Sequence, residues 1–103
     1  MHLTIEDKLP AVKTLCQKHG VEALYLFGSA AKGEMNETSD YDFMVRFSSE
    51  VKLLEYADNY FSLHGKLEEL LGRKVDLVSE KSVKNPVLVK EIMETRIPLY
   101  EAA

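Results

Sequence analysis

The sequence has little of what would tie the chain together covalently or carry it across a membrane. It contains one cysteine, Cys16, so no disulfide can form within the chain, and this composition fits a cytoplasmic protein. No apolar run approaches the ~20 residues needed to span a bilayer, and no basic segment followed by an apolar stretch opens the chain. Internal repeats and linker-like tracts are also absent. We therefore expect a soluble cytoplasmic protein that is not divided by any linker.

The sequence also has fewer basic residues than acidic residues. The chain has 13 lysine and arginine residues against 17 aspartate and glutamate residues, and its formal net charge is −4. A nucleic-acid-binding surface is normally basic, so RNA or DNA is disfavoured as a partner. A chain of 103 residues can bury one core but is too short for a second substrate-binding module. Residues 1–103 are therefore expected to form a single domain.

Glycines and an asparagine–proline pair mark the ends of the expected helices and strands. Gly20 and Gly72 end two helices, and Asn85-Pro86 supplies an N-cap and a first helical residue for a third. Pro10 either kinks the first helix or marks where its regular part begins. Helices are expected at 4–19, around 30, at 53–71 and at 86–95, and strands at 23–27, 41–47, 74–79 and 97–100. This order predicts an α/β (α+β) fold: a small mixed β-sheet with helices packed mainly on one face.

The longest expected helix carries an amphipathic stripe. Six residues recur at alternating spacings of four and three, namely Leu53, Ala57, Tyr60, His64, Leu67 and Leu71. Such spacing predicts one face packed on the sheet. His64 lies on this stripe and is interpreted as a core residue with its polar atoms satisfied, and not as a ligand.

Three carboxylates are the most informative feature of the sequence. Asp40 and Asp42 are two residues apart at the start of an expected strand, so their side chains point the same way. Asp76 interrupts the apolar run of a later strand. If the two strands are neighbours, the three carboxylates meet, and hard oxygen donors without a cysteine or histidine cluster suit Mg²⁺ or Mn²⁺. The alternative for Asp40 and Asp42 is a helix-cap or turn aspartate followed by a solvent-facing one, and the alternative for Asp76 is a charge on an exposed strand face.

A glycine–serine turn precedes the carboxylates. The buried strand ending at Phe27 breaks at Gly28-Ser29, where glycine lets the backbone approach a phosphate and the following amides can bind its charge. Ser29 can also cap the short helix that follows. These two roles are compatible.

The motifs together resemble the minimal nucleotidyltransferases of the DNA polymerase β-like superfamily. That family has glycine, serine, any residue, alanine, arginine and glycine, then aspartate-any-aspartate, then an aspartate on a later strand. Every element is present here, with Lys32 where arginine is usual. The resemblance implies a polymerase β-like core with ATP as substrate and two Mg²⁺ ions, or Mn²⁺, on Asp40, Asp42 and Asp76, which are the catalytic residues. It also implies nucleotide contacts at Gly28, Ser29, Lys32 and Ser39, although Lys32 could be an ordinary surface lysine and Ser39 a turn residue.

The resemblance also suggests an acceptor. Minimal nucleotidyltransferases of this kind often act as the antitoxin of a HEPN-domain toxin, so we expect transfer of AMP to a hydroxyl of such a partner protein. One alternative is an antitoxin or nucleotide sensor that acts by binding without catalysis. Another is adenylylation of a small molecule, which the absence of an added acceptor domain disfavours. Exposed apolar helix residues could support a homodimer or a heteromer.

Overall fold

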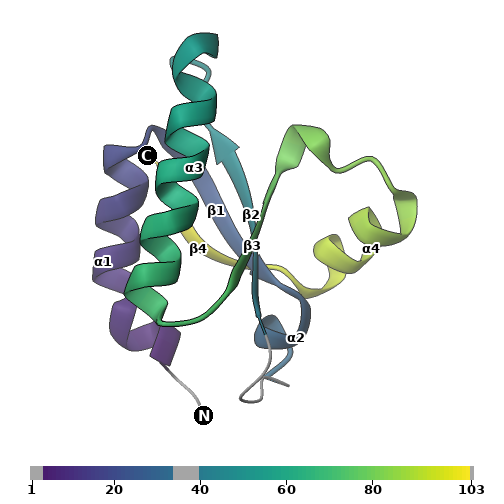
Figure 1. Ribbon diagram of the computed structural model, residues 1–103. Helices are drawn as coiled ribbons and strands as arrows, with labels where there is room; N and C mark the ends of the chain where they lie inside the picture. The colour runs from purple at the N-terminus through teal and green to yellow at the C-terminus, as the bar shows by residue number, and fades with distance from the viewer. Residues whose placement is uncertain (1–3, 34–39, 103) are drawn as a thin grey trace.

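The computed structural model describes residues 4–33 and 40–102, and Figure 1 shows their arrangement. The helices are α1 (Thr4–Lys18), α2 (Gly28–Ala31), α3 (Leu53–Leu71), the 3₁₀ turn η1 (Glu80–Ser82) and α4 (Pro86–Thr95), and the strands are β1 (Val21–Phe27), β2 (Tyr41–Phe47), β3 (Val75–Ser79) and β4 (Ile97–Glu101). The expected α/β (α+β) fold is confirmed. Among these helices, none is both long and apolar enough to cross a membrane.

Local signals account for most of the boundaries. Gly72 ends α3 in the left-handed conformation with φ 66°, and the Asn85 side chain accepts hydrogen bonds from the backbone amides of Val87 and Leu88 at the start of α4. α1 begins at Thr4 and continues through Pro10. The alternative in which its regular part begins at Pro10 is therefore wrong.

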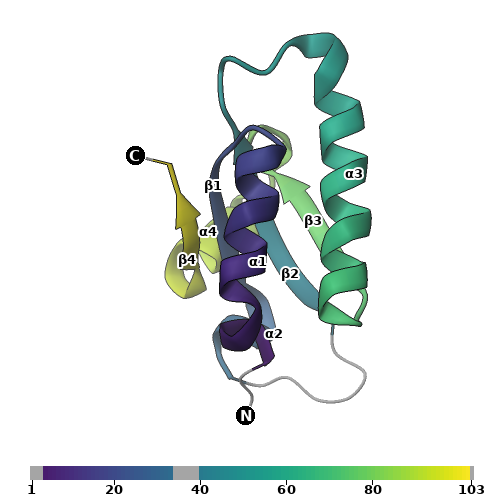
Figure 2. The same cartoon turned by 90° about the vertical axis from the view of Figure 1, so that its left-hand side faces the viewer.

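The four strands form one mixed sheet in the order β3-β2-β1-β4. β1 is antiparallel to both β2 and β4, whereas β2 and β3 are parallel and joined by α3. β4 is an edge strand, as its Pro98 predicts. β3 forms the other edge, and Figure 2 shows the sheet with β4 and α3 on opposite sides of the view.

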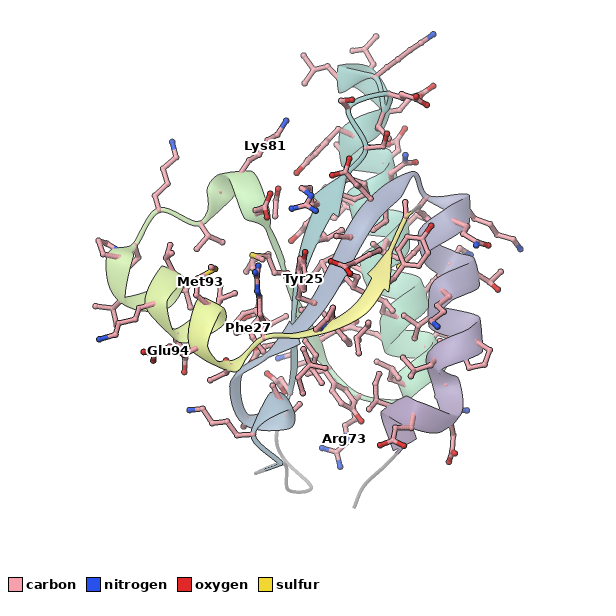
Figure 3. All side chains as sticks on the ribbon, turned by 180° about the vertical axis from the view of Figure 1, so that it is seen from behind. Tyr25, Phe27, Arg73, Lys81, Met93 and Glu94 are labelled. Atoms are coloured by element: carbon pink, nitrogen blue, oxygen red, sulfur yellow. The ribbon has the colours of Figure 1, made fainter. Side chains whose placement is uncertain are left out.

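The two faces of the sheet are covered unequally. α1 and α3 lie side by side over one face (Figure 1) and enclose the larger core, which includes Phe43 and Leu63. α4 lies on the opposite face, where Ile92 packs with Tyr25 and Phe27. Figure 3 shows both aromatic side chains on the side of the sheet that faces α4. Because α4 is short, part of this second face stays open.

The predicted stripe on α3 is partly wrong. Leu67 and Leu71 are buried as expected, but Leu53 is 87% exposed and Ala57 is also exposed. Leu63, which the stripe omitted, is fully buried. The start of α3 extends past the end of the sheet (Figure 1), so the sheet does not cover this part of the helix.

A row of polar side chains on α3 lies against the outer edge of β3. The Tyr60 hydroxyl donates to the Leu77 carbonyl oxygen, and His64 Nε2 lies 2.8 Å from the Val75 carbonyl oxygen. The Val75 amide donates to Glu68 Oε2 at 3.0 Å. We call Tyr60, His64 and Glu68 the α3 polar row. Its contacts occupy backbone groups that an edge strand would otherwise leave open, and they explain why His64 lies on a packed helix face.

Candidate active site

Two of the predicted carboxylates are direct neighbours. In the parallel β2–β3 pair, Asp42 is the register partner of Asp76, and partners in adjacent strands have side chains on the same face. That face is the open part of the side that α4 covers. Asp42 is half-buried and Asp76 is exposed. The condition that the strand of Asp76 lies beside the strand of Asp42 is therefore met.

Gly28 packs directly against Asp42. Phe27, the last residue of β1, is the register partner of Asp42, so the turn after β1 lies beside this carboxylate. A Cβ atom at Gly28 would lie 2.4 Å from Asp42 Oδ2, and the backbone there has φ +73°. Both the close approach and the left-handed conformation require glycine. The glycine–serine turn and the carboxylates therefore form one site.

The electrostatics of this site centre on Asp42. Burial, and then repulsion by Asp76, Asp40 and Glu91 in that order, together raise the pKa of Asp42 to about 6. Each of these groups disfavours the ionised form of Asp42. The site thus concentrates negative charge that a cation or a cationic side chain would relieve.

Glu91 is a site residue that sequence reasoning missed. It lies on α4, and its Oε1 is 3.8 Å from Lys32 Nζ. Thr95, one turn further along α4, donates from Oγ1 to the Glu91 carbonyl oxygen and accepts from the Gly28 amide at 3.4 Å. These contacts join α4 to α2. No motif marks Glu91 because its position depends on how α4 packs.

The other predicted site residues differ in exposure, and one of them is not described by the structure. Ser29 is half-buried in α2, next to Gly28, and Lys32 is exposed just after α2. Asp40 is exposed immediately before β2 and acts on Asp42 through its charge. Ser39 lies outside the described residues. Within 4–33 and 40–102, no three His, Cys, Asp or Glu side chains are grouped as ligands of one metal ion.

Comparisons with known proteins agree with this geometry. The chain is 44% identical over 85 residues, 82% of its length and 83% of the relative's, to a Methanocaldococcus jannaschii protein named "Putative protein adenylyltransferase". A structure described as a "putative minimal nucleotidyltransferase" is 38% identical and superposes with a TM-score of 0.71, covering 95% of this chain and 96% of the other.

A third comparison concerns the fold. A chain in a complex of a tri-AMPylated HEPN toxin from Shewanella oneidensis with its MNT antitoxin has a TM-score of 0.65 at 21% identity, over 94% of this chain and 72% of the other.

The family model described as "Polymerase beta, Nucleotidyltransferase" matches residues 11–103, a range that includes the glycine–serine turn and all three carboxylates. This chain therefore belongs to the polymerase beta nucleotidyltransferase family.

Proposed function

We propose that this chain transfers AMP from ATP to a hydroxyl group of a partner protein. The observation that carries the proposal is the Asp42–Asp76 pair on neighbouring parallel strands, with Gly28 in contact with Asp42. The adenylyltransferase name of the 44% identical relative supports this choice of nucleotide and reaction.

The reaction is a single displacement at phosphorus. The acceptor oxygen forms a bond to the α-phosphorus of ATP, the bond from that phosphorus to the bridging oxygen breaks, and pyrophosphate leaves with the electron pair. We propose that the acceptor hydroxyl gives its proton to Asp76. Alignment of the reacting atoms and stabilisation of the phosphate charge do most of the catalytic work.

Divalent cations suit the chemistry of the carboxylates that are present, although the described residues do not group three of them around one ion. Asp40, Asp42 and Asp76 offer hard oxygen donors of the kind that Mg²⁺ and Mn²⁺ prefer, and the raised pKa of Asp42 supports a site with uncompensated negative charge. We propose that these three residues hold two ions, which would supply charge neutralisation at the phosphates.

The glycine–serine turn is the proposed phosphate site. Gly28 brings the backbone close to Asp42, Ser29 follows it, and Lys32 offers a point charge in place of the fork of an arginine. Lys32 pairs with Glu91, so it must exchange this exposed partner for a phosphate oxygen. Ser39 remains a proposed nucleotide contact.

A HEPN-type toxin is the partner we propose. The chain shares its fold with a protein in a complex of an AMPylated HEPN toxin and an MNT antitoxin. By this proposal the chain is an antitoxin that inactivates its toxin by AMP transfer. An antitoxin that acts by binding alone is the competing function.

Intact mass spectrometry separates these functions. A HEPN-domain protein from the same genome is incubated with this chain, ATP and Mg²⁺, beside two variants. Asp42→Asn removes a site carboxylate, and Asp58→Asn changes an exposed aspartate on α3 as a matched control. We expect a mass increase of one or more AMP groups with the wild type and with Asp58→Asn, and none with Asp42→Asn. Co-elution of the two proteins without any mass increase would instead establish antitoxin action by binding.

A further inference from the structure

A groove of about 710 Å³ lies beside the edge strand β3, between the first half of α3 and the segment that leads into α4. Its volume is within the range of ligand-binding pockets, about 300–1,000 Å³. Most of its lining is apolar or aromatic and includes Ala57, Tyr60, Phe61, Val83 and Leu88. Asp76 also lines it, so the groove opens directly onto the candidate active site.

The strand order determines on which side of the carboxylates the groove lies. Across the sheet, Gly28 follows β1, Asp42 lies on β2, Asp76 lies on β3, and the groove lies beyond β3. Neighbouring strands are about 4.8 Å apart, so the glycine–serine turn and the groove are separated by roughly 10 Å with the carboxylates between them. In an in-line displacement the attacking and leaving oxygens are on opposite sides of phosphorus. If the leaving phosphates occupy the turn, the acceptor approaches from the groove.

The edge of β3 limits how a partner can bind there. The α3 polar row already contacts the amide and carbonyl groups of Val75 and the carbonyl group of Leu77. A partner strand would have to displace these contacts in order to pair with β3. The side-chain surface of the groove is available instead, because Phe61 is 69% exposed at its rim. Binding through an inserted side chain is therefore favoured over strand addition.

We propose that the groove receives an apolar side chain of the partner polypeptide next to the residue that carries the acceptor hydroxyl, and so places that hydroxyl at Asp76. The inference rests on the proposed function, and it adds a recognition surface to it. Aromatic residues at a partly open apolar surface are typical anchors of protein contacts. The groove then selects acceptors by the residue beside the hydroxyl.

Peptide titrations followed by NMR amide shifts test this inference without turnover. The probes are two short unstructured peptides that carry one tyrosine, flanked by leucine in one and by glycine in the other, each added with an ATP analogue whose α,β-bridging oxygen is replaced by a methylene group. We expect the leucine peptide to shift the amides of groove residues such as Ala57 and Val83. We also expect it to bind about tenfold more tightly than the glycine peptide.

Matched variants test whether the preference for the leucine peptide arises in the groove. Phe61→Glu and Ala57→Glu place a charge in the groove at exposed positions, and Leu54→Glu places the same charge on α3 at a residue that is 91% exposed and does not line the groove. We expect both groove variants to abolish the preference for leucine and Leu54→Glu to keep it. Equal binding of the two peptides, shifts confined to other surfaces, or groove shifts caused by the ATP analogue alone would overturn the inference.

The two proposals fail in different ways. If the wild type transfers AMP to its partner and Phe61→Glu transfers it with an unchanged KM for that partner, the groove inference fails and the proposed function stands. If the leucine peptide binds in the groove but no AMP is transferred to any acceptor, the proposed function fails and the groove remains a binding surface.

Discussion

At the residue scale, Asp42 is held in conditions that oppose its charge. Its pKa is raised to about 6 by burial and then by Asp76, Asp40 and Glu91, whereas an unfolded aspartate titrates near 3.9. The folded chain therefore binds a proton more tightly than the unfolded chain between these values. The free energy of unfolding should fall as the pH rises from about 4 to about 6, because stability contributed by a raised carboxyl pKa is lost on ionisation.

Asp42→Asn should remove this pH dependence. In EDTA at pH 8, we expect the variant to be more stable than the wild type by on the order of 1 kcal/mol, a figure reduced for solvent screening because the side chain is only half-buried. At pH 4 the two proteins should differ much less. Thermal unfolding of both at the two pH values checks this, and a destabilised variant at pH 8 would contradict the assignment of Asp42 as a strained carboxylate.

Gly28 and Gly33 form a matched pair for testing the close approach. Both have a left-handed backbone, with φ +73° and φ +74°, but a Cβ at Gly28 meets Asp42, whereas one at Gly33 has no atom of the described residues within 4 Å. We expect Gly28→Ala and Gly33→Ala each to lose about 1 kcal/mol of stability through the backbone. Only Gly28→Ala should lose more than this and abolish AMP transfer. Urea denaturation and the transfer assay distinguish the two effects, and equal losses in both variants would show that the contact with Asp42 is unimportant.

At the scale of elements, α3 stabilises the exposed edge of β3 as well as the core. Glu68 accepts a hydrogen bond from the Val75 amide, while its neighbour Glu69 is exposed. We expect Glu68→Ala to destabilise the protein by about 1–3 kcal/mol, because it leaves a part-buried amide without its acceptor. Glu69→Ala should have little effect. Hydrogen exchange at the Val75 amide measures this directly, and unchanged protection in Glu68→Ala would contradict the role of the polar row.

The elements were largely predictable because their ends carry strong local signals. Gly72 and Asn85-Pro86 define the end of α3 and the start of α4 through backbone geometry and capping, which depend on neighbouring residues alone. The face that α3 buries was not predictable in full. Its period was right, but Leu53 and Ala57 are exposed, because the tertiary arrangement decides which part of the helix face is covered.

The candidate site, like the fold, was predictable only in part. Asp42 and Asp76 could each be assigned to a strand from the sequence, and the pairing of those two strands brings them together. Glu91 could not, because α4 reaches the site through its packing against α2 and the Thr95 contact with Gly28. The metal ligands remain a prediction, and so does the role of Ser39.

At the scale of the whole molecule, binding of a ligand to the folded chain should increase the free energy of unfolding. If a divalent ion binds the folded chain and not the unfolded chain, a concentration of about 100 times Kd stabilises the fold by about 2.7 kcal/mol. For a chain of this size, 1 kcal/mol corresponds to about 4–8 °C in Tm. We expect Mg²⁺ to raise the Tm of the wild type well above that of the EDTA-treated protein and to leave Asp42→Asn nearly unchanged. An equal rise in both would indicate binding elsewhere.

The order of the strands also has a consequence for the growing polypeptide on the ribosome. β1 leads into the glycine–serine turn, yet one of its two hydrogen-bonding partners is β4, which follows all the other described strands in sequence. Until residues 97–101 emerge from the exit tunnel, one side of β1 has unpaired amide and carbonyl groups that can pair with other chains. Translation that stops before Ile97 should therefore yield a product that contains all three carboxylates but is prone to aggregate.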